Sequence, residues 1–448
     1  MPSLWFSQAL LPTGWASSVR AQISGGRFTA ITADTPFQSG DHRLGPAFPG
    51  LANVHSHAFQ RGMAGLAETA GPTDDDFWSW REAMYRFVLT LNPDQIEAIA
   101  ALAFAEMAEA GFTTVGEFHY LHHAPDGTRY ANIAELAFRI GAAAETVGLG
   151  LTLLPVFYAH GNFGGAPASP RQARFLTSIE EYAKLVEAAR EAIIHLDDSV
   201  LGTAPHSLRA ASLDEIITAA ALAKGGPVHI HAAEQTREVA DCVAHFGARP
   251  VEVLLDRAGA ADNWCLIHAT HLTESETQRL AHSGAVAGLC PVTESNLGDG
   301  VFPTPAYLAA GGRFGIGTDS NILISAADEL KALEYIQRLT HRARNVLAPP
   351  GGSTGRRLFD AALAGGNRAL GLGDRAIAPG CVADVVTLDA AHPSLALAKG
   401  DGLLDAWIFA GARIDAVWRA GRQIVAGGRH VGKDAILSRY ARTMASLA

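Results

Sequence analysis

The sequence has few cysteines and no long hydrophobic run. Its 448 residues contain four cysteines, which stand far apart without a C-x-x-C pair: Cys242, Cys265, Cys290 and Cys381. This pattern is typical of reduced, buried thiols rather than of a disulfide framework, and it favours the cytoplasm. No stretch of about 18 apolar residues is available to span a bilayer, and the opening MPSLWFSQALLPTGW lacks the basic and apolar parts of a secretory signal. We therefore expect a soluble protein that is not exported.

Basic residues are scattered along the chain and are fewer than acidic residues. Lys and Arg number 35 against 45 Asp and Glu, which gives a formal net charge of -10. Such a chain has no electrostatic footprint for nucleic acid or for an anionic membrane. An anionic small-molecule substrate would therefore need arginines placed locally at its site. The hydrophobic fraction of 48% and the charged fraction of 18% are those of an ordinary globular protein, with one large core or two moderate ones.

The middle of the chain alternates short apolar runs with long helical segments such as residues 93–111 and 178–196. This alternation predicts repeated β-α units around a parallel sheet. Eight runs can be counted: GLANVHSH (50–57), TTVGEFHY (113–120), LTLLPVFY (151–158), VLGTAPHS (200–207), PVHIHAAE (227–234), WCLIHATH (264–271), AVAGLCPV (285–292) and RFGIGTDS (313–320). Eight is the number that closes a (β/α)8 TIM barrel, an α/β fold. A doubly wound open sheet is the alternative, but no G-x-G-x-x-G follows an early strand to support it.

Both ends of the chain have the pattern of short strands separated by glycine turns. LWFSQALL and VRAQISGGRFTAIT lie in the first 48 residues, and ADVVTLD, LLDAWIFAG, IDAVWRAG and RQIVAGGRHV lie near the end. Their β-branched and aromatic residues predict a small β-sandwich-like domain made from residues 1–48 and 376–430. We place the barrel at residues 49–375 and a C-terminal helix at residues 431–448.

Metal-ligand residue types recur where the predicted strands end, which is where barrel enzymes place their chemistry. His55 and His57 project from the same side of an extended strand, because successive side chains alternate. With His231 after the fifth strand and Asp319 after the eighth, they form a set of three imidazoles and one carboxylate. This set suits zinc and leaves one position for water. His229 lies a layer deeper on the same face, which indicates a core histidine.

Three strand-end residues are predicted to carry out hydrolysis at a carbon that bears nitrogen. A divalent metal makes water nucleophilic near neutral pH, and Asp319 can accept the proton that the water gives up. Glu234, just past the fifth strand, is predicted to pass protons to the nitrogen of the group under attack. His268, at the end of the sixth strand, is predicted to hydrogen-bond the water or the charge that develops at the attacked carbon.

These residues resemble the amidohydrolase superfamily, and within it the aminohydrolases that use a single metal. The resemblance covers nearly the whole chain, including a β domain split around the barrel. In that superfamily an H-x-H on strand one, histidines on strands five and six, and an aspartate on strand eight recur. The matching residues here are His55, His57, His231, His268 and Asp319. The H-x-x-E that ends in Glu234 is typical of the deaminating branch.

The resemblance also bears on the number and kind of metal ions. Members with two metals usually carry a lysine at the end of strand four, and LGTAPHS has none there. One divalent ion per chain is therefore implied, with zinc preferred and iron or manganese also suited to three imidazoles and a carboxylate.

The resemblance is stronger to one family of the superfamily, the formimidoylglutamate deiminases. Seven motifs occur in order: PGLANVHSHAFQR, DDFWSWREAMY, GEFHYLHH, TAPHSLRA, HAAEQ, CPVTESNLGDG and GIGTDSN. This resemblance implies hydrolysis of N-formimidoyl-L-glutamate to N-formyl-L-glutamate and ammonia in histidine degradation, by a homodimer. The CPVTESNLGDG stretch differs from the C-P-x-S-N form of purine and adenosyl deaminases, which counts against those substrates.

A glutamate-derived substrate has two carboxylates, for which arginine supplies bidentate donors. Arg209, three residues after His206, is the arginine that the resemblance favours as a carboxylate ligand. The resemblance also implies substrate contacts for Gln60, Tyr120 and His206. Arg81 is a further candidate, although its tryptophan neighbours indicate a packed helix in which a structural ion pair would explain it equally well.

Other interpretations stay open at the level of the sequence. A different mononuclear aminohydrolase, acting on guanine, cytosine or an adenosyl compound, would use the same metal residues. A barrel without activity, serving as a scaffold, would be expected to have lost them. His119, His122 and His123 suggest a second metal site, but no carboxylate is spaced to complete it.

Overall fold

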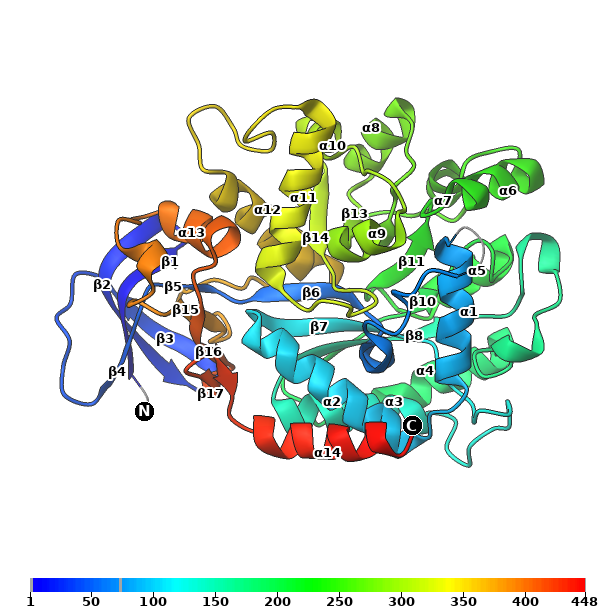
Figure 1. The fold of residues 1–448 in the computed structure, drawn as a ribbon, viewed down its shortest axis with the longest axis horizontal. Helices are drawn as coiled ribbons and strands as arrows, with labels where there is room; N and C mark the ends of the chain where they lie inside the picture. The colour runs from blue at the N-terminus through cyan, green and yellow to red at the C-terminus, as the bar shows by residue number, and fades with distance from the viewer. Residues whose placement is uncertain (1–2, 72–74, 448) are drawn as a thin grey trace.

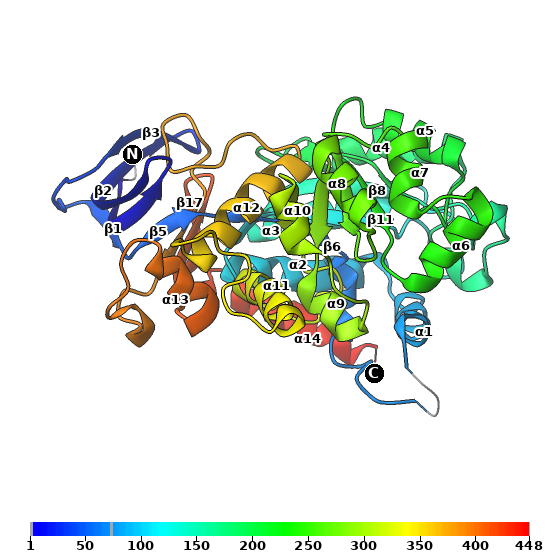
Figure 2. The same cartoon turned by 90° about the horizontal axis from the view of Figure 1, so that it is seen from above.

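The computed structural model describes residues 3–71 and 75–447 and contains two β-sheets (Figure 1). One sheet is closed into a ring of parallel strands surrounded by helices, and the other is a mixed sheet built from the two ends of the chain. Viewed from above, the mixed sheet lies to the left and the ring of strands to the right (Figure 2). No helix in the described ranges has the length and apolar character needed to cross a membrane.

The predicted eight-stranded barrel is confirmed. Its strands are β6 (Leu51–Ser56), β7 (Phe112–His119), β8 (Gly150–Phe157), β9 (Val200–Leu201), β10 (Ala204–Pro205), β11 (Val228–Ala232), β12 (Trp264–His268), β13 (Val286–Leu289) and β14 (Arg313–Ile316). Their order is β10-β8-β7-β6-β14-β13-β12-β11, and β9 and β10 together occupy the fourth position. The ring closes where the His229 amide donates to the Thr203 carbonyl at 3.0 Å, since this links the fourth position to β11.

Helices cover the outside of the ring, as parallel strands require. They are α2 (Pro93–Glu109), α3 (Glu135–Val147), α4 (Ile179–Ile193), α5 (Leu213–Ala221), α6 (Thr236–Phe246), α7 (Pro250–Arg257), α8 (Glu274–Ser283), α9 (Pro291–Leu297), α10 (Thr304–Ala309), α11 (Ala326–His341) and α12 (Thr354–Ala369). Both helices predicted from periodicity are present with clear start signals. Asn92 caps α2 and Ser178 caps α4, because their side chains accept the N–H groups of Gln95 and Glu181.

The two ends of the chain form one mixed sheet. Its strands are β1 (Ser3–Leu11), β2 (Gly14–Ser24), β3 (Arg27–Thr32), β4 (Asp41–Leu44), β5 (Ala47–Pro49), β15 (Val385–Leu388), β16 (Ile414–Arg419), β17 (Arg422–Ala426) and β18 (Arg429–His430). The N-terminal and C-terminal halves join where β5 pairs antiparallel with β15, with Phe48 opposite Val386. A barrel with a small terminal β unit is therefore confirmed, while the residue limits given to each domain stay predictions.

One predicted strand of the terminal sheet is wrong. LLDAWIFAG forms α13 (Gly402–Ala410), which ends at Gly411 with φ 70°. Leucine and alanine are good helix formers, and Trp407, one of the aromatic residues that suggested a strand, is instead buried on a helix face with Leu403 and Leu404. Trp407 on that face packs against Phe48 with ring centroids 4.9 Å apart, and Asp405 accepts the Gly355 N–H at the start of α12. The helix thus fills the junction between the terminal sheet and the barrel helices.

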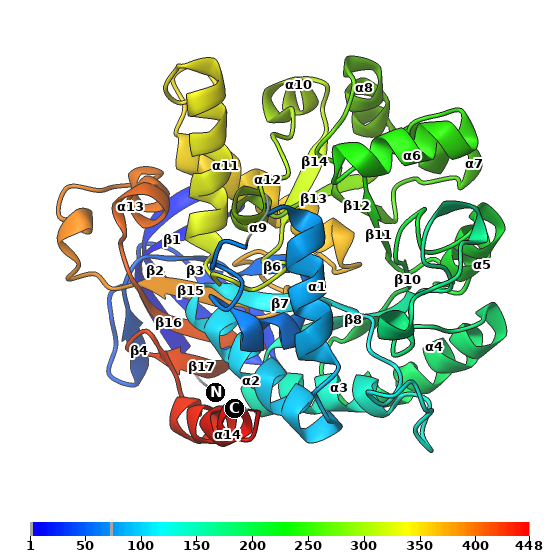
Figure 3. The same cartoon turned by 45° about the vertical axis from the view of Figure 1, so that its right-hand side comes forward.

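Two further helices lie outside the barrel ring. The predicted C-terminal helix is α14 (Lys433–Ala445), which runs beside α2 (Figure 1) and pairs with it through Lys433 and Glu109 at 2.8 Å. The helix α1 (Phe77–Val88) stands in front of β6 and β7, apart from the helices that ring the barrel (Figure 3). Short 3₁₀ turns complete the chain: η1 (Ala58–Met63), η2 (Phe163–Gly165), η3 (Pro170–Gln172) and η4 (Pro393–Leu395).

Candidate metal and catalytic site

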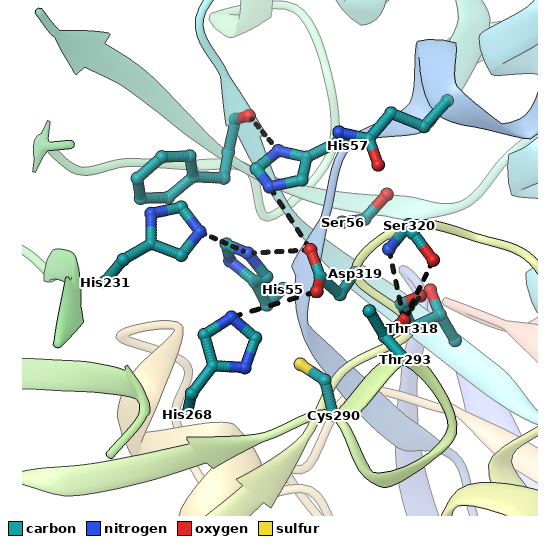
Figure 4. Close-up of polar contacts among 12 residues, drawn as sticks. His55, Ser56, His57, His231, His268, Cys290, Thr293, Thr318, Asp319 and Ser320 are labelled. Atoms are coloured by element: carbon teal, nitrogen blue, oxygen red, sulfur yellow. Dashed lines mark hydrogen bonds and ion pairs between the residues drawn. The ribbon is translucent and has the colours of Figure 1, made fainter. Parts of the chain in front are cut away.

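The four residues predicted as metal ligands lie together at the carboxyl ends of β6, β11 and β14 (Figure 4). One donor atom from each of His55, His57, His231 and Asp319 lies within 4.8 Å of the others, and all four residues are buried. The Nε2 atoms of His55 and His57 are 3.4 and 3.3 Å from Asp319 Oδ1. The distance between His231 Nε2 and His55 Nε2 is 3.1 Å.

Neighbouring carbonyl groups turn the imidazoles toward one another. His57 Nδ1 lies 2.9 Å from the Phe118 carbonyl oxygen, and His231 Nδ1 lies 3.0 Å from that of His206. A carbonyl oxygen only accepts, so each Nδ1 carries the proton and each Nε2 presents a lone pair to the centre of the cluster. Lone pairs that converge at these distances repel unless a cation lies between them. The donor set therefore fits one divalent metal ion.

Burial also sets the protonation state of the donors. It lowers the pKa of His55 to about 3, so the imidazole is neutral. Burial alone would raise the pKa of Asp319, but the contacts of its carboxylate with the His55 and His57 imidazoles outweigh burial and hold that pKa well below its usual range. Neutral imidazole and ionised carboxylate are the forms that bind a metal.

Glu234 and His268 adjoin this cluster. His268 Nε2 lies 3.7 Å from Glu234 Oε1 and 3.8 Å from Asp319 Oδ2. Burial raises the pKa of Glu234 to about 7, so this carboxyl can both hold and release a proton near neutral pH. Burial lowers the pKa of His268, but Glu234, Glu294 and Asp319 together raise it to about 10. The structure thus brings together the three residues predicted to act in the hydrolysis.

A pocket opens above these residues and contains every predicted substrate contact. Its cavity volume is about 60 Å³. The predicted contacts that line it are Gln60, Arg81, Tyr120, His206 and Arg209. Phe77, Trp80, Met84 and Tyr85 of α1 form one wall, so this helix closes the pocket on the side away from the barrel.

Both arginines in the pocket have donors without partners. Arg209 is 8% exposed and its Nε makes no hydrogen bond, while its Nη2 lies 4.0 Å from Glu234 Oε2. Arg81 stacks on Trp78 at 4.5 Å, and its buried Nε is also unpartnered. The structural ion pair considered for Arg81 is not found within residues 3–71 and 75–447. Buried guanidinium donors without acceptors fit an anionic ligand better than a packing role.

The neutral candidates have free acceptor or donor atoms as well. Gln60 Nε2 donates to the Tyr120 hydroxyl at 2.9 Å, and Gln60 Oε1 has no partner. His206 Nδ1 lies 3.0 Å from Ser207 Oγ, which leaves its Nε2 for the pocket. These three residues come from the ends of β6, β7 and β10, and they supply hydrogen bonds beside the arginines.

The other histidines lie away from the metal cluster. His229 Nε2 contacts the Ala369 carbonyl at 2.7 Å, as expected of a core residue. His122 Nε2 and His123 Nε2 contact the carbonyls of Val156 and Leu176 at 2.8 Å. In the part of the chain that the structure describes, no group of metal-ligand side chains includes His119, His122 or His123.

Two acidic residues of the site, Glu294 and Asp299, were not predicted from the sequence. Glu294 Oε1 accepts the Cys290 N–H at 2.9 Å and lies 3.2 Å from His268 Nδ1, so it fixes the orientation of that ring. Asp299 lies within 4.8 Å of Glu234 and His268, and burial raises its pKa to about 8. Both belong to CPVTESNLGDG, which was singled out as a motif. Its acidic residues were the signal that could have identified them.

Family comparisons agree with this geometry. A model of the amidohydrolase family matches residues 47–424, and one described as the N-terminal domain of formimidoylglutamate deiminase HutF matches residues 3–45. Formimidoylglutamate deiminase of Pseudomonas aeruginosa is 48% identical over 452 residues, which is 100% of both chains. The chain belongs to the amidohydrolase family, in the branch of the formimidoylglutamate deiminases.

Other relatives and solved structures resemble this chain to different degrees. A 5-methylthioadenosine/S-adenosylhomocysteine deaminase of Natronomonas pharaonis is 30% identical to this amidohydrolase over 77% of this chain and 73% of its own. The crystal structure of an amidohydrolase from Brucella melitensis has a TM-score of 0.97 and 53% identity over both full chains. A zinc-bound adenosine deaminase from Xanthomonas campestris, 22% identical over 99% of this chain and 98% of its own, has a TM-score of 0.79 and so shares the fold.

Proposed function

We propose that this chain hydrolyses N-formimidoyl-L-glutamate to N-formyl-L-glutamate and ammonia, the activity of histidine degradation that names its full-length relative. The observation that carries the proposal is the pocket itself. A cluster of metal ligands with adjoining proton carriers lies at one end, and Arg81 and Arg209 present unpartnered donors beside it. A substrate with one amidine and two carboxylates matches both ends.

His55, His57, His231 and Asp319 would hold one divalent ion, and zinc is the ion we propose. A divalent ion bound there supplies the Lewis acidity that makes water a nucleophile at neutral pH. The three imidazoles and one carboxylate also suit iron or manganese. Elemental analysis of protein purified from its own cells, without added metal, would identify the resident ion and its stoichiometry.

The protein residues carry the protons of the reaction. Water adds through its oxygen to the carbon of the cationic formimino group, and one of its protons passes to Asp319. Glu234 donates a proton to the terminal nitrogen, whose bond to carbon then breaks as the second carbon–oxygen bond forms. The remaining hydroxyl proton passes back to Glu234, and ammonia leaves. His268 Nε2, 3.7 Å from Glu234 and 3.8 Å from Asp319, hydrogen-bonds the oxygen as charge develops on it.

The remaining pocket residues bind and orient the substrate. Arg209 pairs with one carboxylate and Arg81 with the other, since both guanidinium groups lack an acceptor for Nε. Gln60, Tyr120 and His206 hydrogen-bond the rest of the molecule. Together these contacts hold the formimino carbon beside Glu234 and His268.

Ammonia release over a panel of compounds tests the substrate. The panel contains formimidoylglutamate, formimidoylaspartate, guanine, cytosine and S-adenosylhomocysteine, each at the same enzyme concentration. The proposal predicts the highest kcat/KM for formimidoylglutamate. Faster turnover of S-adenosylhomocysteine would instead favour the activity that names the 30% identical relative.

Two further features of the protein are also proposals. We infer a cytoplasmic location from the four cysteines, which form no disulfide in the described residues, because reduced thiols persist in the cytoplasm. A homodimer is expected by resemblance to the family, and sedimentation of the purified protein would measure it.

A further inference from the structure

A second set of metal-ligand side chains lies next to the first. His268 ends β12, Cys290 follows β13 and Asp319 follows β14, so three successive strands each contribute one donor (Figure 4). One atom from each lies within 4.8 Å of the others, and all three residues are buried. The hydrolysis proposed above uses His268 and Asp319 but gives Cys290 no role.

The two oxygens of Asp319 face different neighbours. Oδ1 lies 3.4 and 3.3 Å from the Nε2 atoms of His55 and His57, whereas Oδ2 lies 3.8 Å from His268 Nε2. A carboxylate in this position can bind one cation through each oxygen, as in two-metal sites. An ion at the second set therefore does not require that the first ion leaves.

The donor types indicate which ion would bind. Thiolate is a soft ligand, imidazole is borderline, and one carboxylate oxygen completes the set; this combination favours zinc or cadmium and disfavours magnesium, calcium or manganese. We propose that His268, Cys290 and Asp319 form a second, inhibitory site for a thiophilic divalent ion beside the resident metal. The thiol proton of Cys290 and the Nε2 proton of His268 are released to solvent when the ion binds.

Occupancy of this site would stop the reaction for a geometric reason. An ion on His268 Nε2 takes the atom that faces Glu234 Oε1 at 3.7 Å, and an ion on Asp319 Oδ2 takes the other oxygen of the proton acceptor. His268 is then unable to hydrogen-bond the attacking oxygen, and Asp319 is unable to accept the proton of water. Inhibition rests on the proposed function, whereas binding of the second ion does not.

Cadmium titration of the protein with its resident metal tests the proposal. Wild type is expected to bind one cadmium ion per chain in addition to its resident ion. Binding should produce a sulfur-to-cadmium charge-transfer band in the ultraviolet difference spectrum and abolish ammonia release. Cys290→Ser should keep the resident ion and the basal activity, but lose both the band and the additional cadmium ion. The cadmium concentration that halves activity should rise by more than about tenfold, since even loss of a supporting residue costs that much at metal sites.

A neighbouring cysteine provides the matched control. Cys265 is buried in the same apolar cluster as Cys290 but belongs to no group of metal-ligand side chains in the described residues. Cys265→Ser should therefore bind cadmium as wild type does. If Cys290→Ser does not fold, the triple variant Cys242→Ser, Cys265→Ser, Cys381→Ser keeps Cys290 as the sole cysteine and must retain the band.

The measurements separate this proposal from the proposed function. A wild-type protein whose total metal content stays at one ion per chain in excess cadmium would overturn the second site, and so would an unchanged band in Cys290→Ser. Metal stoichiometry and the band are read without substrate. If formimidoylglutamate is not hydrolysed at all, they still decide whether the second site exists.

Discussion

Two residues of the site, His268 and Asp319, have backbone angles that residues other than glycine seldom adopt. Their φ values are 66° and 42°. Such a conformation costs about 1–3 kcal/mol and persists only where the surrounding structure holds it. Glu294 holds the His268 ring, and the histidines of β6 contact Asp319. The strain directs both side chains into the space between the strand ends, where the reaction is proposed to occur.

A comparison of two histidines on β11 tests the metal cluster. His231→Asn should lose the resident metal and with it the activity, because two imidazoles and a carboxylate hold the ion too weakly. His229→Asn removes a buried histidine from the same strand, but one that contacts the Ala369 carbonyl and not the cluster. It should keep one metal per chain. Elemental analysis after gel filtration measures the metal content of both variants. Equal metal content would contradict the assignment of His231 as a metal ligand.

The proton-carrying role of Glu234 predicts a selective loss. Glu234→Gln should keep the metal, since Glu234 is not among its four proposed ligands, but lower kcat by about 100- to 10,000-fold, because an amide cannot donate and accept protons. Metal content and single-turnover rates measure the two effects separately. Turnover close to that of wild type would remove Glu234 from the reaction.

The charge of Arg209 should matter for binding and orientation rather than for metal. Arg209→Met removes a charge-assisted contact worth on the order of 2–4 kcal/mol, or roughly 30- to 1000-fold in kcat/KM, while the metal content stays the same. Arg209→Lys should restore only part of the loss, because an ammonium group cannot form the paired contacts of a guanidinium.

A substrate analogue identifies the carboxylate that Arg209 binds. Formimidoylglutamate with its side-chain carboxylate converted to an amide should be a poor substrate for wild type. If Arg209 binds that carboxylate, the kcat/KM for the analogue should differ little between wild type and Arg209→Met. A large difference would assign Arg209 to the other carboxylate.

At the scale of strands and helices, the site depends on how β14 is joined to β6. The Asn321 amide nitrogen lies 3.2, 3.1 and 3.2 Å from Ser56 Oγ and the carbonyls of His57 and Asp319. Its Oδ1 accepts the Thr318 hydroxyl at 2.6 Å. One side chain thus links the strand that carries two histidine ligands to the loop that carries the aspartate.

This link predicts a loss of metal affinity on substitution away from the ligands. Asn321→Ala should weaken metal binding by about 10- to 100-fold and lower the free energy of unfolding by about 1–3 kcal/mol, because buried partners are left without hydrogen bonds. Asn263→Ala is the control, since Asn263 donates to the Gly226 carbonyl at the opposite end of the barrel. A chelator competition assay that finds the same metal affinity in both variants would contradict the link.

Strand and helix predictions succeeded where a pattern was local. The eight barrel strands were found because each is a short apolar run followed by polar residues, and the ligand residues follow from the position of those ends. LLDAWIFAG was assigned wrongly because its apolar residues, Trp407 among them, are buried by a helix face rather than by a sheet. Local composition alone does not distinguish these two ways of burying an apolar residue.

Residues that act through distant partners could not be predicted in this way. Glu294 and Asp299 follow β13, and their relation to His268 arises only when β12 and β13 lie side by side. Arg81 was left open between substrate contact and ion pair, because its environment is made by α1 packing over the pocket. Long-range packing, not sequence spacing, decides such contacts.

At the scale of the whole molecule, the local charge of the pocket opposes the charge of the protein. The chain has a formal net charge of -10, yet the pocket contains two arginines with unpartnered donors. A substrate with two carboxylates is therefore attracted only close to the pocket. The barrel supplies the reactive groups from its strand ends, and α1 supplies the outer wall with Arg81.

The identity of the products tests the central claim most directly, because the formimino carbon has two bonds to nitrogen. Cleavage of the terminal bond gives formylglutamate and ammonia, whereas cleavage of the other gives formamide and glutamate. The proposed placement of Glu234 beside the terminal nitrogen predicts one equivalent each of formylglutamate and ammonia. Proton NMR of the reaction mixture and an ammonia assay measure these products. Formamide and glutamate as the products, or unchanged formimidoylglutamate with metal-loaded protein, would contradict the account.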